Sequence, residues 1–246
     1  MCGRYVAVSS PTILAERFDV AEVRVRAIEP SYNVTPRADV PVVAENRGGA
    51  ARGTRVLDLV RWGLVPSWAE SLSIGDRQIN ARAERIRTAN AYKRAFARRR
   101  CIIPADGFYE WAGNDRAAAD GARKKVKQPW FFRRRDGEPL AFAGVWEVWH
   151  DPARGEDAPR IRTCSIITTQ ANELVAPVHH RMPVVLPESA WPEWLDRENH
   201  DVEALHRLLV PAPVDELEAW PVTTLVNKPE NNGSELLDPA PVVSTA

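Results

Sequence analysis

A cysteine occupies the second position of the 246-residue chain, in the opening MCGRY. Removal of Met1 would leave Cys2 with a free α-amine and a thiol on one residue. The pKa of an α-amine is about 7.7–8.0, against about 10.4 for lysine, so far more of it is neutral at pH 7. A neutral amine attacks an aldehyde to give a Schiff base, and the neighbouring thiol can then close a five-membered thiazolidine. Cys2 is therefore either a terminal nucleophile or merely a small residue tolerated beside the initiator.

Two further stretches combine ionisable residues with rigid apolar neighbours, IIPADGFYEW at 102–111 and APVHHRMPVVL at 176–186. Glu110 ends an apolar strand pattern, so it is either a solvent-facing carboxylate or a desolvated acid/base of raised pKa. His179 and His180 titrate near neutrality, and the inward-facing one would suit a proton donor to a sugar oxygen. Arg181 beside them would suit a phosphate.

The stretches INARAE and RWGLVPSW offer groups for binding rather than for proton transfer. Asn80 and Arg82 share a face if this segment is extended and diverge if it is helical. Asn80 either caps a helix or holds a reacting group, in which case Arg82 would hold a backbone phosphate. Trp62 and Trp68 are either core residues or platforms on which unpaired bases stack.

The elements that must position these residues are mostly strands. Segments rich in β-branched and aromatic residues predict strands at 39–45, 55–65, 99–111, 129–135, 139–149 and 160–169. Helical patterns cover 79–99, 187–196 and 202–209, and a short helix followed by a turn is expected within 12–28. Without regular βαβ alternation, this order predicts an α+β fold with a curled, mostly antiparallel sheet, a barrel-like core and a few flanking helices.

We expect a single domain over residues 1–232 and a partly flexible tail at 233–246. The stretches 45–54, 112–128 and 150–160 are rich in glycine, proline or charge. Each lies between two predicted strands, so each is expected as an exposed hairpin extension rather than a domain linker.

The formal net charge is zero, but its distribution is uneven. Residues 1–186 carry 30 Lys+Arg against 21 Asp+Glu, and residues 187–246 carry 3 against 12. The basic body either suits a polyanion such as nucleic acid or is solvated charge without a partner. No apolar run approaches the roughly 20 residues that span a bilayer, and the start lacks a secretory signal, so a cytoplasmic protein without membrane contact is expected.

The chain has only three cysteines, Cys2, Cys101 and Cys164. They are too few and too scattered for a disulfide framework or a paired metal-ligand motif. No metal and no cofactor are therefore expected, and Cys101 and Cys164, each in an apolar strand pattern, are expected as inert core thiols.

The ordered set of motifs resembles the SRAP family, named for SOS response-associated peptidase and comprising abasic-site processing proteins. The motifs run in order through almost the whole chain: MCGRY, SYNVTP (31–36), RWGLVPSWA (61–69), INARAE (79–84), RRCIIPADGFYEW (99–111), FAGVWEVW (142–149), TTQAN (168–172), HHRMPVVL (179–186) and LVN (225–227). One such motif would be a weak signal, whereas the ordered set is specific.

The resemblance implies an enzyme that senses abasic sites in single-stranded DNA and shields them during the DNA damage response. It implies that Cys2, after loss of Met1, forms a thiazolidine crosslink with the ring-opened deoxyribose. Asn80 would position the lesion, and Glu110 would assist Schiff-base formation and crosslink reversal. His179 would act as acid/base on the sugar, chosen over His180 because the family pattern reads His-x-Arg-Met-Pro.

The resemblance further implies a positively charged groove for the DNA strand. Arg4, Arg82 and Arg181 would contact phosphates there, and Trp62 and Trp68 would line the groove. The peptidase label implies self-processing at the amino terminus, as a hydrolase or lyase rather than a general protease. The basic insertion around 113–128 and the acidic C-terminal part depart from the family pattern.

Two other classes of function remain compatible with parts of the sequence. N-terminal-nucleophile glutamine amidotransferases also begin Met-Cys-Gly, but they would leave the Glu110 and His179 motifs unexplained. A non-covalent single-stranded DNA-binding module would use the arginines and tryptophans without any chemistry. In either DNA-binding case a monomer is expected, and the sequence identifies no replication-fork partner.

Overall fold

The computed structural model describes residues 2–46, 53–117, 123–155 and 157–241, the side chains of 114–117 and 123–126 excepted. Five strands close into a barrel: β4 (Asp39–Glu45), β5 (Arg55–Trp62), β7 (Arg100–Ala105), β10 (Leu140–Trp149) and β11 (Ile161–Gln170). Neighbouring strands pair antiparallel in the order β5-β4-β7-β10-β11, and a parallel pairing of β11 with β5 completes the ring.

The barrel is covered on both faces of its wall, which is why its strands read as nearly continuous apolar runs. All six residues of β7 are buried. Ile103 belongs to the cluster that also contains Trp62, whereas its neighbour Ile102 packs in a second cluster with Trp194 of α3. Successive side chains of a strand point to opposite faces, so one β7 face lines the barrel and the other supports the helices.

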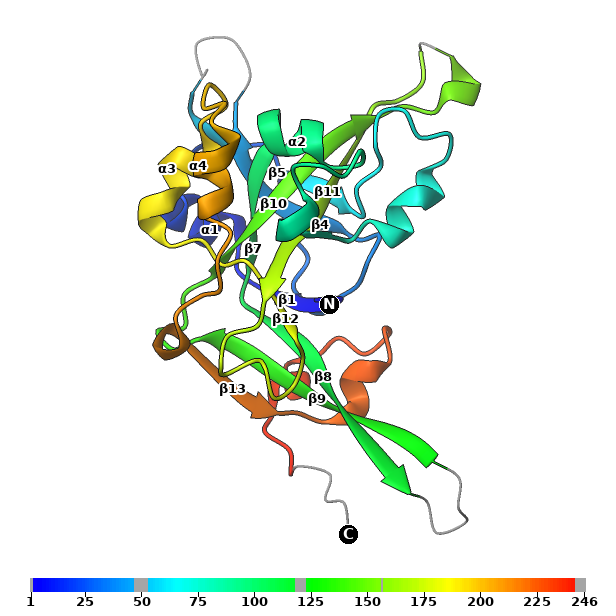
Figure 1. Ribbon diagram of the computed structural model, residues 1–246, viewed down its shortest axis with the longest axis vertical. Coiled ribbons are helices and arrows are strands. Elements are labelled where there is room, and N and C mark those ends of the chain that lie inside the picture. Colours follow the sequence, from blue (N-terminus) through cyan, green and yellow to red (C-terminus); the bar gives the residue numbers. More distant parts are fainter. Residues whose placement is uncertain (1, 47–52, 118–122, 156, 242–246) are drawn as a thin grey trace.

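A second, five-stranded antiparallel sheet lies below the barrel in Figure 1. Its order is β13 (Leu217–Pro221), β9 (Arg123–Arg134), β8 (Gly107–Ala117), β1 (Arg4–Ala7) and β3 (Ser31–Val34). β7 and β8 join the two sheets through Asp106, whose Oδ2 accepts hydrogen bonds from the Val8 and Ser9 amides at 2.6 and 3.0 Å. The β8–β9 hairpin projects away from the rest of the molecule (Figure 1).

Short edge strands and helices complete the fold. β2 (Val20–Val23) pairs with β5, and β6 (Asn80–Arg82) and β12 (Arg181–Pro183) pair with β11. The helices are α1 (Pro11–Arg17), α2 (Lys93–Arg98), α3 (Trp191–Leu195) and α4 (Val202–Arg207). Single turns of 3-10 helix are η2 (Leu72–Arg77), η3 (Ala83–Arg85), η4 (Pro152–Arg154), η5 (Glu188–Ala190), η6 (Val214–Glu216), η7 (Thr224–Asn227) and η8 (Ser234–Leu237).

The predicted fold class is confirmed: a curled, mostly antiparallel sheet forms a barrel-like core with a few short helices around it. Among the described residues no helix has the length and apolar character needed to cross a membrane. The pairing of β8 with β9 also confirms the hairpin expected at 112–128. The stretch 45–54 falls partly outside the described residues.

The helix predicted over 79–99 is wrong for its first half. Asn80–Arg82 is strand β6, and α2 begins only at Lys93. The alanine and arginine spacing there mimics a helical pattern, but parallel pairing with β11 holds the segment extended. The strand predicted over 99–111 is two strands, since the chain bends at Asp106 between them, and β8 begins at Gly107, where a Cβ would lie 2.3 Å from the Phe131 ring.

The predicted domain boundary at residue 232 stays a prediction. Described residues beyond it pack on the second sheet: Leu236 is fully buried, and the Trp220 indole donates to the Leu237 carbonyl at 2.7 Å. Residues 242–246 of the expected tail lie outside the described residues.

Candidate active site

The candidate site is a pocket of about 420 Å³ where the amino end of the chain meets the second sheet. β1 pairs antiparallel with β8, with Arg4 opposite Tyr109. This register brings the first residues of the chain to Glu110. The pocket is lined by Gly3, Arg4, Glu110, Trp111, Lys127, His179 and Asn227.

Cys2 precedes β1 and is fully buried. Its Sγ lies 3.9 Å from the Arg4 carbonyl oxygen, and its own carbonyl accepts a hydrogen bond from Asn80 Nδ2 at 2.9 Å. Burial raises the pKa of the Cys2 thiol, and the negative charge of Glu110 raises it further. The thiol is therefore protonated at neutral pH in this environment.

Asn80 occupies the first position of β6, opposite Ile166 of β11. It is extended and does not cap a helix, so Asn80 and Arg82 share a face of the strand. Its amide nitrogen holds the Cys2 backbone. Its Oδ1 is buried and has no hydrogen-bond partner within the described part of the chain, which leaves an acceptor for a bound group.

Glu110 is only 2% exposed, on β8 beside the amino end of the chain. Desolvation by burial raises the pKa of its carboxyl to about 7, although the positive charge of the amino terminus opposes the shift. A carboxyl group of this pKa exchanges protons readily at neutral pH.

His179 lies two residues before β12, and its Nδ1 is 3.9 Å from Glu110 Oε1. The same Nδ1 lies 3.0 Å from the Arg181 amide nitrogen and 3.1 Å from the Arg181 carbonyl oxygen, so the backbone of Arg181 can pair with either tautomer of the neutral imidazole. Burial lowers the pKa of His179, which keeps the imidazole neutral at pH 7. The exposed His180 ring stacks on it at 4.5 Å between centroids.

The arginines predicted to contact DNA have different surroundings. Arg181 is buried, and its guanidinium binds the Glu84 carboxylate with both terminal nitrogens, as well as the Thr168 carbonyl. Arg4 is half-buried and donates to Asn33 Oδ1 at 2.7 Å and to the Val226 carbonyl at 3.0 Å. Arg82 is exposed at the end of β6. Their DNA contacts stay predictions.

The two tryptophans also differ. Trp62 is fully buried in the barrel, where its indole donates to the Ile79 carbonyl at 2.9 Å and its ring meets Tyr5 edge-on. Its side chain offers no exposed face on which a base could stack. Trp68 is 60% exposed, and its contact with a base stays a prediction.

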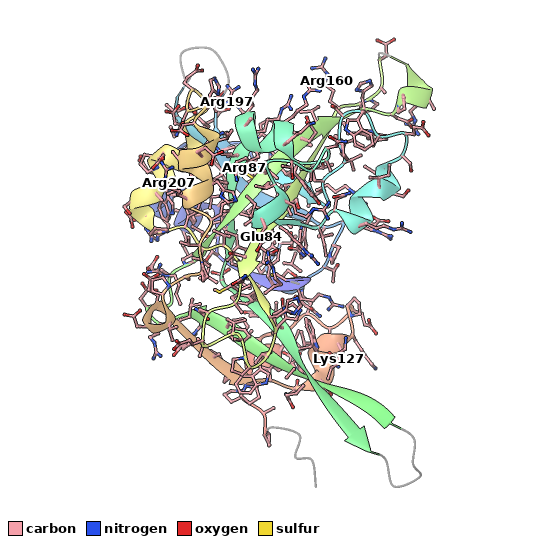
Figure 2. The ribbon with its side chains drawn as sticks, viewed as in Figure 1. Glu84, Arg87, Lys127, Arg160, Arg197 and Arg207 are labelled. Atoms are coloured by element: carbon pink, nitrogen blue, oxygen red, sulfur yellow. The ribbon has the colours of Figure 1, made fainter. Side chains whose placement is uncertain are left out.

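Four pocket residues were not anticipated from the sequence: Gly3, Trp111, Lys127 and Asn227. The Trp111 indole donates to Asn227 Oδ1 at 2.7 Å and so joins β8 to η7 across the pocket wall. Lys127 is exposed on β9, and Figure 2 shows it where the hairpin leaves the sheet. The basic run KKVKQ could have indicated Lys127 as a pocket residue. A hairpin strand that returns beside Glu110 and Trp111 must pass the pocket that these residues line.

Within the described residues, no group of three or more histidine, cysteine, aspartate or glutamate side chains could hold a metal ion. Cys101 and Cys164 are buried free thiols. The pocket itself presents a carboxyl and an imidazole, and the buried thiol of Cys2 lies directly before the lining residue Gly3.

Comparison with known proteins places the chain in a family. Residues 1–229 match the family described as SOS response associated peptidase (SRAP). The chain is 39% identical over 239 residues to the abasic site processing protein YoaM of Bacillus subtilis (strain 168), covering 97% of this chain and 98% of that one. It is 32% identical to the abasic site processing protein HMCES of Gallus gallus, over 85% of this chain and 66% of that one.

Solved structures share the fold. A protein from Bacteroides thetaiotaomicron superposes with a TM-score of 0.81 at 23% identity, over 97% of this chain and all of the other. A protein from Bordetella bronchiseptica gives a TM-score of 0.71 at 25% identity, over 90% of this chain. With a family match over residues 1–229 and relatives of nearly equal length, the chain belongs to the SRAP family.

Proposed function

We propose that this protein recognises abasic sites in single-stranded DNA and joins them covalently to Cys2 once Met1 has been removed. The observation that carries the proposal is the pocket that unites the amino end of the chain with Glu110 and His179. The relatives named as abasic site processing proteins support the choice of an abasic deoxyribose among possible aldehydes.

The order of bond formation follows from the state of Cys2. A buried thiol of raised pKa is a poor first nucleophile, whereas an α-amine at the terminus has a substantial neutral fraction at pH 7. The amine therefore attacks the aldehyde carbon first, and loss of water leaves an imine. The thiol sulfur then bonds to the imine carbon while its proton passes to the nitrogen, closing the thiazolidine with a net loss of one water.

Glu110 is the proton carrier for both steps. With a pKa of about 7 it can accept a proton from the α-ammonium group or the thiol and donate one as the carbinolamine loses water. The same carboxyl would assist the reverse reaction. Removal of Met1 by the protein itself belongs to this proposal and would use the same end of the chain.

His179 acts on the sugar. The abasic deoxyribose is mostly a closed ring, and opening it to the aldehyde requires proton transfer at the ring oxygen and the hydroxyl. A neutral imidazole carries one N–H donor and one acceptor nitrogen, so it can serve both as donor and as acceptor in such a transfer. The unpaired Asn80 Oδ1 would accept a hydrogen bond from the bound lesion.

The DNA strand would cross the mouth of the pocket. Lys127 and Arg82 offer exposed cations for phosphates, and the exposed ring of Trp68 offers a stacking surface. The Arg181 backbone amide would help to hold the His179 ring in position. The Arg181 guanidinium already binds Glu84, so it would contact a phosphate only by dividing its N–H donors between the phosphate and Glu84.

Intact mass spectrometry tests the proposal. The purified protein should have lost Met1, and incubation with a single-stranded oligonucleotide carrying one abasic site should add the oligonucleotide mass less one water. Cys2→Ala should abolish the adduct while non-covalent binding is largely kept. Retention of Met1 or absence of an adduct would reject the covalent function, and glutamate release from glutamine would then favour the amidotransferase alternative.

A further inference from the structure

A second concave surface, outside the candidate active site, is lined only by helix α2 and the residue that follows it. It is a pocket of about 580 Å³ bounded by Lys93, Arg94, Ala97, Arg98 and Arg99. Ala97 contributes only a methyl group, so it forms the bottom of the pocket, and the longer side chains around it form the sides. The pocket therefore presents four cations around one depression.

The positive charge of this pocket is largely uncompensated. Arg99 pairs with the buried carboxylate of Glu147 at 2.8 Å. Within the described part of the chain, no carboxylate lies within 4 Å of the charged ends of Lys93, Arg94 or Arg98. Many other surface arginines are paired, as Arg87 is with Glu203. Concentrated charge of one sign on a chain of zero net charge creates a local field that attracts an anion.

The pocket is tied to the candidate active site by one side chain. Tyr92 directly precedes α2, and its hydroxyl donates to the Asn80 carbonyl at 3.1 Å. Between Asn80 and α2 the chain carries the exposed Arg82 and Arg85. In Figure 1, α2 lies above β1 and β12, on the barrel half of the molecule. Cations thus continue along the chain from the lesion-binding strand to α2.

We propose that the α2 pocket binds the phosphate backbone of the DNA on one side of the lesion, as a subsite separate from the pocket that holds the abasic sugar. This inference rests on the proposed function for its ligand. Arginine forks and a lysine point charge suit the closely spaced phosphates of a nucleic acid, and contacts to phosphates carry no information on base identity. The subsite lengthens the footprint and adds affinity independent of sequence.

Oligonucleotide length separates this subsite from the active site. In a Cys2→Ser background, which cannot close the stable thiazolidine, Lys93, Arg94 and Arg98 are all replaced by glutamine. Binding is measured by fluorescence anisotropy at several salt concentrations, with a short abasic oligonucleotide of a few nucleotides and a long one of about 20. For the long oligonucleotide the slope of log K against log salt should become shallower by about 2, because three contacts each contribute about 0.7. For the short one the slope should not change.

A matched triple variant, Arg26→Gln, Arg135→Gln and Arg160→Gln, removes the same charge from exposed positions away from both pockets. It should leave both slopes unchanged, and thermal melting should show both variants folded. An equal effect from the control, an equal effect on short and long oligonucleotides, no effect at all, or no binding of the long oligonucleotide by the parent would each overturn the subsite. Wild-type crosslinking of the short oligonucleotide reports separately on the proposed function.

Discussion

Burial sets the protonation state of each reactive side chain in the pocket. Cys2 is fully buried and its thiol pKa is raised, His179 is half-buried and its imidazole pKa is lowered, and both groups are consequently neutral at pH 7. Burial raises the pKa of the Glu110 carboxyl to about 7, so this carboxyl changes charge near neutrality. A carboxyl that changes charge near neutrality beside a neutral thiol suits the proton-carrier role proposed for it.

The crosslinking rate should therefore depend on pH through Glu110. Its carboxylate form, which accepts protons from the amine and the thiol, becomes populated as pH rises through about 7. We expect the wild-type rate on abasic DNA to rise through this range and Glu110→Gln to be slower by about 100-fold or more, the usual contribution of a general base. Single-turnover rates from denaturing gels between pH 5.5 and 8.5 measure this.

The ionisation of the α-amine also affects the pH profile of the crosslinking rate, and it serves as the internal control. Glu110→Gln should retain only the rise caused by the amine, whose ordinary pKa is about 7.7–8.0. A variant that reacts at the wild-type rate at pH 7 would refute the role of Glu110.

Lys127→Gln should weaken non-covalent binding of abasic DNA. One lost phosphate contact on a single strand lowers the salt slope by about 0.7, and Lys127→Arg should restore it. At saturating DNA the crosslinking rate should stay near wild type, because Lys127 lies at the mouth of the pocket rather than at the reacting atoms. Arg135→Gln, at the exposed position just after the far end of β9, is the control, and an equal loss there would contradict a specific contact.

Residue types and their order along the sequence were enough to pick out residues that lie together in the fold. They were not enough to predict what surrounds each of these side chains. The sequence brought forward Cys2, Asn80 and Glu110, which the fold assembles. It left open whether Trp62 was core, and it assigned Arg181 to a phosphate without revealing that Glu84 binds it, because Ile79 and Glu84 come from other segments of the chain. Long-range partners of this kind have no local signature.

At the scale of elements, one buried amide holds the wall of the pocket. Asn33 of β3 lies in the motif SYNVTP, whose role the sequence did not reveal. Its Nδ2 donates to the carbonyls of Val226, Lys228 and Asn231 at 3.2, 3.0 and 3.0 Å. Its Oδ1 accepts a hydrogen bond from the Arg4 guanidinium. The loop after η7 is thus fastened to the strand beside the amino end.

Asn33→Ala should release this loop. The Asn231 carbonyl loses its donor, the Val226 and Lys228 carbonyls and the Arg4 guanidinium each keep only one of their partners, and leaving buried polar groups unsatisfied costs about 1–3 kcal/mol. We expect a lower free energy of unfolding in urea and slower crosslinking, because Arg4 and Asn227 both line the pocket. Asn90→Ala, at an exposed position, should change neither quantity, and wild-type stability of Asn33→Ala would show that the loop is held by other contacts.

Strands were predicted more reliably than helices for a physical reason. The barrel strands carry long apolar runs whose burial does not depend on one partner, as in β7. The segment Asn80–Arg82 has no such run and is extended only because β11 offers a free edge. The local pattern of alanine and arginine does not predict pairing with β11, a strand more than 80 positions away in the sequence.

At the scale of the whole molecule, the buried Glu110 carboxyl, which we propose as the proton carrier, should reduce the stability of the fold. In the unfolded chain Glu110 ionises near its ordinary pKa of 4.5, whereas in the folded protein it ionises at about 7. The folded state therefore binds the proton more tightly, and stability falls as pH rises from about 4.5 to 7. The loss is complete above the folded pKa and amounts to roughly 3 kcal/mol.

Glu110→Gln removes the charge while keeping the shape of the side chain, so it should remove this pH dependence. The variant should match the wild type near pH 4.5 and exceed its free energy of unfolding at pH 8 by roughly 3 kcal/mol, even though it crosslinks slowly. Urea denaturation at half-unit pH steps measures the difference, with Glu173→Gln at an exposed position as the control. Parallel wild-type and Glu110→Gln curves would mean that the carboxyl is not desolvated in the folded protein, and the proton-carrier role would lose its physical basis.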